Sequence, residues 1–307
     1  MAEKSLETLS RTVAQDCAAL NIINGKKCSS ISEETLRVVC PSDGDVFAQI
    51  PASDTADIDV AVSAARHALE EGPWARTTAT ERGRLLTKLG LLIEKYADEL
   101  AAIESRETGK PLRQGVADAQ ATIRYFEYYG GAADKVHGDT IPFLATHTAM
   151  TVREPHGVVA GIIPWNYPMQ IFARVAGAAL AMGNTLVIKP AEDASLTSIR
   201  IAELAMEAGF PEGVLNVVTG LGTIAGASLS GHHDVDYVTF TGSPPTGTAI
   251  QSAAAANNRG VTMELGGKSP QLVFADANIE AAIPVLVNAI IQNGGQTCSA
   301  GSRILVE

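Results

Sequence analysis

The sequence predicts an α/β fold in which a Rossmann-type parallel sheet carries helices on both faces, and two observations support this prediction. From residue 157 onward, short apolar runs such as GVVAGII, TLVIKP and DYVTFTGS alternate with segments of helical periodicity. Near-continuous apolar strands separated by amphipathic helices are typical of a parallel sheet that is buried on both faces. In addition, 307 residues with 46% hydrophobic and 19% charged side chains are enough for two domains or one large α/β domain.

The first part of the chain is expected to contain short strands and then three helices. Strand-like runs broken by turns occupy residues 21–55. A first helix is predicted from about Asp57, and a second begins at Thr78, where the sequence TATE has the spacing of a capping box. Leucines and isoleucines from 85 to 103 give this second helix a wide apolar face. A third helix is predicted from about Arg113 to Gly130.

The second part begins with a hairpin-like stretch at 139–155 and then alternates between strands and helices. GVVAGII precedes a helix at 168–182, and the later strand-like runs TLVIKP, VLNVVTG, DYVTFTGS and VTMEL are separated by further helical segments. Ligands of such sheets bind outside the carboxyl ends of the strands. We therefore searched for functional residues where each predicted strand ends.

The composition argues against several classes of protein. A formal net charge of −11 disfavours a surface that follows phosphates, so no nucleic-acid partner is expected. No uninterrupted apolar run reaches the roughly 18 residues of a membrane span, and the opening MAEKSLETLS lacks the apolar centre of a secretory signal. Cys17, Cys28 and Cys40 have neither CxxC pairs nor nearby histidines, so no metal site is expected. We interpret them as ordinary thiols in a reducing cytoplasm.

An acidic residue after the second strand of the alternating half suggests a dinucleotide site. If GVVAGII is the first strand, TLVIKP is the second, and Glu192 lies just beyond it. A carboxylate there can accept hydrogen bonds from both ribose hydroxyls and would repel a 2′-phosphate, which favours NAD over NADP. Lys189 could contact the same ribose. Taken alone, the two residues are better interpreted as a solvated ion pair in a loop.

Two glycine-containing turns also follow predicted strands. Gly220 begins GLGTIA, a loose dinucleotide fingerprint, but the next strand ends in FTGS without the acid that the fingerprint requires. The simple fingerprint is therefore discounted, and Gly220 remains a candidate contact of the cofactor. In FTGS, Gly242 permits close backbone approach, and the Ser243 hydroxyl with free N–H groups can meet an anion. A plain serine N-cap explains Ser243 about as well.

Seven motifs together resemble the NAD(P)-dependent aldehyde dehydrogenase superfamily. They follow the family's order and spacing, and the resemblance extends from about residue 24 to 307. Any one of them could arise by chance, whereas all of them in order could not. The motifs are ERGRLL (81–86), ETGKP (107–111), VVAGIIPWNYP (158–168), IKPAE (188–192), FTGS (240–243), MELGGKSP (263–270) and GQTCSAGSR (295–303).

The resemblance implies a catalytic mechanism and a site. Cys298 is expected to add to the aldehyde carbon, with the Asn166 amide and the Cys298 backbone N–H as the oxyanion hole. After hydride transfer to NAD, Glu264 is expected to activate the water that releases a carboxylic acid. A thiolate nucleophile, a neutral amide donor and a carboxylate base suit these roles chemically. The expected cofactor-binding residues are Trp165, Lys189, Glu192, Gly220, Gly242 and Ser243.

The resemblance also implies a division into domains. An NAD-binding domain is expected from residues 1–135 and 155–265, a bridging and oligomerisation hairpin from 136–154, and the start of a catalytic domain from 266–307. Relatives continue well past the cysteine, and the helix predicted at 281–295 is apolar on nearly every side. We therefore expect a truncated catalytic domain, and little or no activity from this chain alone. The parent enzyme is expected to be a homo-oligomer, either a dimer or a tetramer.

Two other functions remain as alternatives at this stage. One is a non-catalytic remnant that only binds a dinucleotide. The other is a thiol hydrolase or acyltransferase, for which His232 and His233 are the nearest histidine partners of Cys298 in sequence. Within the aldehyde dehydrogenase interpretation, the sequence does not identify the small-molecule aldehyde. Arg174, which stands where many relatives carry lysine, receives no role.

Overall fold

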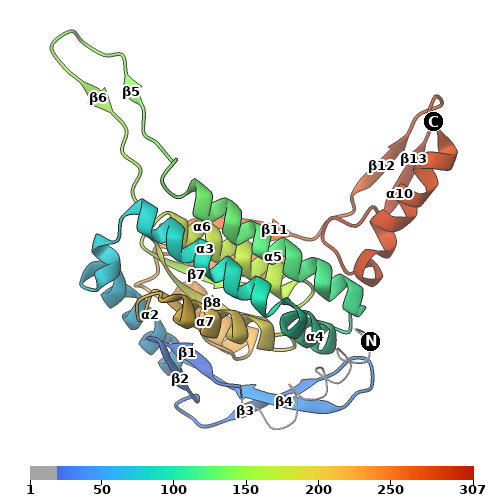
Figure 1. The fold of residues 1–307 in the computed structure, drawn as a ribbon, viewed down its shortest axis with the longest axis horizontal. Coiled ribbons are helices and arrows are strands. Elements are labelled where there is room, and N and C mark those ends of the chain that lie inside the picture. Colours follow the sequence, from blue (N-terminus) through green and yellow to red (C-terminus); the bar gives the residue numbers. More distant parts are fainter. Residues whose placement is uncertain (1–18) are drawn as a thin grey trace.

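The computed structural model describes residues 19–307, so Cys17 and the first residues of the predicted NAD-binding domain lie outside it. A seven-stranded sheet forms the centre of the molecule (Figure 1). From one edge to the other, its strands are β11 (Gly260–Leu265), β10 (Tyr237–Gly242), β7 (Val158–Ile162), β8 (Thr185–Lys189), β9 (Leu215–Val217), β1 (Asn21–Ile23) and β2 (Lys26–Cys28).

The part of this sheet that follows residue 157 is parallel, as predicted. β11, β10, β7, β8 and β9 pair in parallel, and every residue of β7 and β8 is buried. β1 and β2 add an antiparallel edge beyond β9. The chain moves from β7 to β8 and β9 on one side and then returns to place β10 on the other side of β7. This reversal of strand order creates the crevice in which sheets of this type bind ligands.

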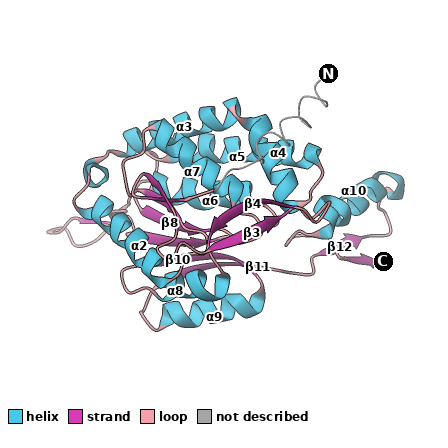
Figure 2. Ribbon diagram, turned by 90° about the horizontal axis from the view of Figure 1, so that it is seen from below, coloured by secondary structure: helices cyan, strands magenta, loops and turns pink. Residues whose placement is uncertain are grey.

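Helices cover both faces of the sheet (Figure 2). Their apolar side chains form two buried clusters, one on each face. The helices of the larger cluster are α3 (Ala79–Lys95), α4 (Ala97–Thr108), α5 (Leu112–Ala132), α6 (Pro168–Ala181) and α7 (Leu196–Ala208). Those of the smaller cluster are α2 (Thr55–Glu70), α8 (Ala227–Gly231) and α9 (Pro244–Ala255). The structure therefore confirms the predicted α/β architecture.

The helix starts illustrate what local sequence determines. The capping box at Thr78 is present, with the Thr78 side chain and the Glu81 side chain each accepting a hydrogen bond from the other residue's backbone. α2 begins at Thr55, slightly before the predicted start, because Asp54 forms a capping box with Asp57. The predicted second helix is divided at Tyr96 into α3 and α4. Both halves pack on the same core, so apolar periodicity alone does not reveal the break.

Two antiparallel pairs lie outside the main sheet. β3 (Thr35–Val39) pairs with β4 (Val46–Pro51). β5 (Thr140–Ile141) pairs with β6 (Ala149–Met150), which confirms a hairpin in the predicted stretch. This hairpin extends away from the body of the molecule (Figure 1). A short 3₁₀ turn, η1 (Pro73–Arg76), follows α2 and buries Trp74.

The last part of the chain forms a unit that projects from the body (Figure 1). β12 (Pro270–Val273) pairs in parallel with β13 (Arg303–Val306), and α10 (Ile279–Ile291) lies between them in sequence. α10 has no buried residue, although most of its side chains are apolar. The turn η3 (Gln292–Gly295) then leads to Cys298. Across residues 19–307, no helix combines the length and apolar character needed to cross a bilayer.

Candidate active site

The predicted site residues, except Cys298, lie at the ends of parallel strands on one edge of the main sheet, whereas Cys298 precedes β13 in the projecting unit. Ile162, the last residue of β7, is aligned with Lys189 at the end of β8 and with Phe240 near the end of β10. Gly242 ends β10 opposite Leu265, which ends β11. The loops that carry the predicted site residues therefore emerge side by side. This edge is where a ligand of a parallel sheet is expected.

The structure brings Asn166 next to the turn that carries Cys298. The Asn166 Nδ2 donates a hydrogen bond of 2.8 Å to the carbonyl oxygen of Gln296, two residues before the cysteine. In return, the Nδ2 of Asn293 donates to the Asn166 carbonyl oxygen at 3.1 Å. Cys298 itself is exposed and unpaired. A carboxamide nitrogen carries two hydrogens, so one N–H of Asn166 is left for a substrate oxygen.

Glu264 lies on the edge strand β11, and the residues that follow it lie next to the cysteine turn. Its side chain is exposed and lines a cavity of about 720 Å³ together with Arg174. Three positions further on, a Cβ on Gly267 would lie 3.6 Å from the Cys298 carbonyl oxygen. The MELGG segment and the cysteine turn are therefore neighbours. Arg174 donates to the Thr241 hydroxyl at 3.1 Å, which links α6 to the end of β10.

Lys189 and Glu192 form an ion pair that is only partly solvated. The Lys189 Nζ lies 2.8 Å from a Glu192 carboxylate oxygen, and the lysine side chain is 2% exposed, against 35% for the glutamate. Burial lowers the pKa of Lys189 against the opposing effect of Glu192. Burial raises the pKa of Glu192, but the hydrogen bond and charge of Lys189 outweigh this effect and lower it. The lysine of this pair is buried at the end of β8, and the carboxylate of Glu192 is partly exposed to solvent.

The Gly220 turn lies against this ion pair, although its sequence alone was discounted. The N–H of Gly222, in the short π-helical turn η2 (Gly222–Gly226), donates to Glu192 at 3.4 Å. Glu192, which follows β8, therefore contacts the GLGTIA turn, which follows β9 and has no acidic residue at the end of the next strand. Gly220 itself has a φ of +146°, and a Cβ there would lie 2.7 Å from the Ser53 carbonyl oxygen. This close packing against Ser53 is sufficient to require glycine.

The remaining predicted cofactor contacts also have identifiable local partners. A Cβ on Gly242 would lie 2.4 Å from the Phe240 ring, so packing within β10 excludes a side chain. Ser243 is the N-cap of α9, and its hydroxyl accepts a hydrogen bond from the Thr246 N–H. Trp165 is 42% exposed at the end of β7, which leaves its ring accessible to a ligand.

The sequence did not indicate a set of side chains that contact the cysteine turn and pack on its interior side. The Tyr167 hydroxyl lies 2.9 Å from the Thr297 hydroxyl, next to Cys298. Beneath Tyr167, the Lys110 ammonium is buried between the carboxylates of Glu104 and Asp118. The motifs ETGKP, VVAGIIPWNYP and GQTCSAGSR contain Lys110, Tyr167 and Thr297, but they do not indicate which side chains these residues contact. Burial raises the pKa of Glu104 well above its usual range, and the neighbouring Asp118 adds to this rise against the opposing charge of Lys110.

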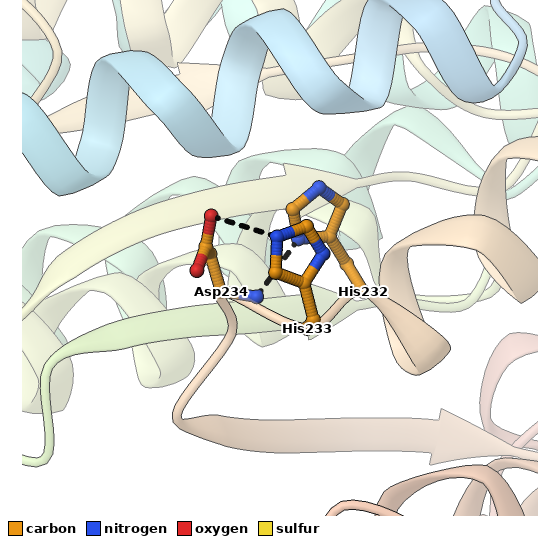
Figure 3. Close-up of side chains that lie close together, drawn as sticks. All are labelled: His232, His233 and Asp234. Atoms are coloured by element: carbon orange, nitrogen blue, oxygen red, sulfur yellow. Dashed lines mark hydrogen bonds and ion pairs between the residues drawn. The ribbon is translucent and has the colours of Figure 1, made fainter.

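The histidines considered as partners of Cys298 are engaged elsewhere. His232 Nε2 lies 3.1 Å from Asp59 on α2, and its Nδ1 accepts a hydrogen bond from the Asp234 N–H. His233 pairs with the Asp234 carboxylate at 3.3 Å (Figure 3). These residues precede β10, whereas the cysteine turn meets the segment after β11, so a strand length of roughly 20 Å separates them. This arrangement does not support a cysteine–histidine hydrolase.

Fold and site together define a class of protein: a Rossmann-type α/β chain with a cysteine and a carboxamide gathered at the carboxyl edge of its sheet. The chain belongs to the aldehyde dehydrogenase family, which it matches over residues 28–307. It is 47% identical over 287 residues to the mitochondrial aldehyde dehydrogenase family 2 member B4 of Arabidopsis thaliana, an alignment covering 93% of this chain and 53% of that protein.

Solved structures agree with this assignment. The crystal structure of a Burkholderia cenocepacia protein described as an aldehyde dehydrogenase matches this chain with 58% sequence identity and a TM-score of 0.93, over 94% of this chain and 61% of that one. The NAD⁺ complex of aldehyde dehydrogenase from Bacillus cereus is 44% identical, with a TM-score of 0.95 over 97% of this chain and 61% of that one. The chain thus spans between half and two thirds of the length of these relatives.

Proposed function

We propose that the protein oxidises a small aldehyde to a carboxylic acid with NAD as the hydride acceptor. The observation that supports this function best is the contact between three loops at one edge of the sheet. Asn166 binds the carbonyl of Gln296, and Gly267, three residues after Glu264, lies against Cys298. The loops that carry the proposed oxyanion donor and nucleophile are thus in contact, and the segment that follows the proposed base reaches the same turn, which supports the reaction of the family to which the chain belongs.

In the proposed first step, the Cys298 sulfur attacks the aldehyde carbon. A C–S bond forms, and the carbonyl oxygen becomes an oxyanion. The second N–H of Asn166 and the Cys298 backbone N–H donate hydrogen bonds to this oxygen. Preorganised donors of this kind contribute about 3–4 kcal/mol each to transition-state stabilisation in related chemistry. The exposure of Cys298 leaves its sulfur accessible to substrate.

The second half of the reaction releases the acid. NAD, when bound, supplies the acceptor for the hydride that leaves the substrate carbon, and Cys298 is left as a thioester. Glu264 then removes a proton from water, the resulting hydroxide attacks the thioester carbon, and the C–S bond breaks. A carboxylate that is exposed beside a cavity has access to the water this step consumes.

The residues at the strand ends fit NAD. Glu192 keeps one carboxylate edge exposed and anchored by buried Lys189, which suits hydrogen bonds to the two hydroxyls of a ribose. Its charge disfavours a 2′-phosphate, so NADP is expected to bind less tightly. Ser243 caps α9, but Pro244 and Pro245 have no N–H and the Thr246 N–H donates to the Ser243 hydroxyl. We therefore assign this position a contact with NAD through the hydroxyl rather than through free backbone N–H groups. Trp165, Gly220 and Gly242 are the remaining proposed contacts.

The reaction can be followed on one tryptic peptide of the protein expressed from its complete gene. Cleavage after Lys268 and Arg303 yields residues 269–303, which contain Cys298. With NAD and propanal, E264Q is expected to form about one NADH per site and to retain a propanoyl group on this peptide, because deacylation needs the base. C298S should form neither product. Running the 307-residue chain in the same assay tests the expectation that it has little activity alone.

Cys28 provides an internal control in the same digest, since it lies on the separate peptide of residues 28–37. Burial raises the pKa of the Cys28 thiol, so it should not be acylated. Equal labelling of the two cysteines, or NADH formation by C298S at the wild-type rate, would contradict the proposed mechanism. NAD binding without any thioester would support a non-catalytic dinucleotide-binding protein instead.

We further propose a cytoplasmic location and a homo-oligomeric assembly. The free Cys28 and Cys40 thiols suit a reducing compartment, although the Arabidopsis relative is described as mitochondrial. The hairpin of residues 136–154 projects from the body and exposes Phe143 and Leu144, which supports its use in assembly. Light scattering of the native protein, with F143S and L144S as variants, tests the assembly.

A further inference from the structure

We propose that Tyr167 is the positioning residue of the cysteine turn, holding residues 292–298 so that Cys298 faces the oxyanion donors. This inference rests on the proposed function and adds a residue outside its reacting groups. Tyr167 is 8% exposed at the start of α6, and its hydroxyl contacts the turn immediately before Cys298. Five further observations support it.

The direction of the Tyr167–Thr297 hydrogen bond follows from the other partners of the tyrosine. The side-chain N–H groups of Gln114 and Gln292 donate to the Tyr167 oxygen at 3.3 and 3.2 Å. A phenolic oxygen has two acceptor sites and one hydrogen. Because both acceptor sites are occupied, the tyrosine proton is directed to the Thr297 oxygen, 2.9 Å away. Tyr167 thereby connects α5, η3 and the residue before Cys298.

The turn is also bonded on both sides of Tyr167. Asn166 donates to the Gln296 carbonyl, and the Gln114 side-chain oxygen accepts from the Asn293 N–H at 3.2 Å. The Asn293 Nδ2 donates to the Asn166 carbonyl. The residues before the cysteine are therefore bound to Gln114 near the start of α5 and to Asn166 and Tyr167, which directly precede α6.

The backbone of the turn requires such support. Asn293, Gly294 and Gly295 have φ values of 51°, 64° and 81°, so three consecutive residues have a positive φ. A non-glycine residue in this region is disfavoured and persists where surrounding contacts determine it. Asn293 is 6% exposed and makes its hydrogen bonds to residues of α5 and of the Asn166 loop.

A buried charge cluster fixes the tyrosine itself. The Lys110 Nζ lies 2.5 Å from an oxygen of Glu104 and 2.5 Å from an oxygen of Asp118, and 4.4 Å from the centre of the Tyr167 ring. An ammonium at this distance from an aromatic face is attracted to it, the more so when it is desolvated. The face of the ring thus contacts the Lys110 ammonium, while the hydroxyl binds Thr297 of the turn.

The same cluster holds the first residues of α6. The second oxygen of Glu104 accepts the Met169 N–H at 3.2 Å, and the second oxygen of Asp118 accepts from the Gln170 side chain at 2.6 Å. Met169 and Gln170, two and three residues after the tyrosine, are therefore anchored to buried carboxylates. The position of Cys298 follows from a continuous path that runs from Lys110 through Tyr167 to Thr297.

Two reactions of Cys298 separate positioning from simple exposure. With 4-nitrophenyl acetate, the thiolate forms a C–S bond, the ester C–O bond breaks and 4-nitrophenolate leaves; the oxyanion formed on the way needs aligned donors. With iodoacetamide, the thiolate displaces iodide and no oxyanion forms. Y167F is expected to slow acylation of the 269–303 peptide by about tenfold, because small misplacements weaken oriented catalysis. Its alkylation rate should stay within about twofold of wild type.

Matched variants test the assignment. T297V, which removes the same hydrogen bond from the other side, should slow acylation as Y167F does, and T297S should restore it. The control is Y237F, because the Tyr237 hydroxyl also lies 2.9 Å from a threonine hydroxyl, that of Thr262, away from the cysteine turn. Wild-type acylation rates in both Y167F and T297V would overturn the proposal, as would equal slowing in Y237F.

The outcome is distinguishable from failure of the proposed function. If wild-type Cys298 is not acylated, the proposed nucleophile fails, and hydrogen–deuterium exchange of the 292–298 amides then decides the positioning role without any chemistry. Exchange several-fold faster in Y167F and T297V supports the positioning role, provided that α7 is unchanged. Unchanged exchange in the turn overturns it.

Discussion

Lys110 and Lys189 are both buried lysines that pair with carboxylates, but their surroundings differ. Lys110 is fully buried with two carboxylates that are also buried, and these bind backbone and side-chain N–H groups of α6. Lys189 pairs with Glu192, whose side chain remains 35% exposed at the edge of the sheet. The first cluster directs all its hydrogen bonds inward, whereas the second presents a charged oxygen to solvent.

The comparison indicates how to distinguish a positioning cluster from a binding site. A charge that is satisfied within the protein on every side supports other residues, and its loss is expected to reduce stability. A charge held by a buried partner but open to solvent is available for a ligand, so its loss should reduce binding. The following predictions test this difference from the largest expected effect to the smallest.

Replacing Lys110 by methionine should have the largest effect. K110M leaves Glu104 and Asp118 buried without a cation, and breaking a buried pair in this way costs about 3–5 kcal/mol of unfolding free energy. Urea denaturation followed by circular dichroism measures the loss. K135M is the control, because Lys135 pairs with Asp134 on the surface, where the expected loss is below about 1 kcal/mol. Equal losses in the two variants would refute the distinction.

Replacing Glu192 by glutamine should reduce NAD affinity and have a smaller effect on stability than K110M. Loss of charge-assisted hydrogen bonds is expected to raise the Kd for NAD by about tenfold or more. The stability is expected to fall by about 1–3 kcal/mol, because the buried Lys189 loses its anion but the glutamine oxygen can still accept its hydrogen bond. Relative affinity for NADP should increase, since the repulsion of a 2′-phosphate is removed. Isothermal titration with both nucleotides measures these effects. D193N, one residue further along an exposed loop, should leave both affinities within about twofold.

Glu107 should show the smallest effect, a change of stability with pH. Its carboxylate is buried but accepts its hydrogen bonds from neutral groups. It accepts hydrogen bonds from the Leu196 and Thr197 N–H groups and from the Thr197 hydroxyl at the start of α7. Burial raises its pKa to about 7. The folded state therefore binds a proton that the unfolded state releases between about pH 4.5 and 7, so stability rises as pH falls through 7.

Between pH 8 and pH 6 this effect amounts to about 1 kcal/mol of unfolding free energy. The measurement is the difference in pH dependence between wild type and E107Q, which has no titrating group at this position. A wild-type stability that falls over this interval while E107Q stays constant would contradict the assignment.

Much of the fold could be predicted because its signals are local. The buried strands of the second half are continuous apolar runs, and the Thr78 capping box depends on residues only three positions apart. The common edge of the loops after β7, β8 and β10 also follows from strand order, because strand ends in a parallel sheet share one edge. The contact of Asn166 with the cysteine turn does not, because Cys298 precedes β13 of the projecting unit. The catalytic roles and the domain boundaries stay predictions.

What could not be predicted depends on contacts between distant residues. Tyr167 and Thr297 are 130 positions apart, and no local pattern indicates their hydrogen bond. Glu104 and Asp118 occupy helices in which acidic residues are usually solvated, so their burial around Lys110 is evident only from packing. Gly220 matched a cofactor fingerprint, yet its contact with Ser53 already requires glycine. Sequence patterns therefore indicated the candidate site but not the interior that supports it.

Glu264 and Cys298 belong to different structural units. Glu264 lies on β11 of the main sheet, one residue before this strand ends, whereas Cys298 is carried by the projecting unit of β12, α10 and β13. The chain joins the two units through residues 266–269, which form no helix or strand. Substitutions in this connection can therefore change the spacing between thiol and carboxylate while both cores stay intact. Under the proposed mechanism, such substitutions would adjust the rate of thioester hydrolysis independently of the proposed NAD contacts.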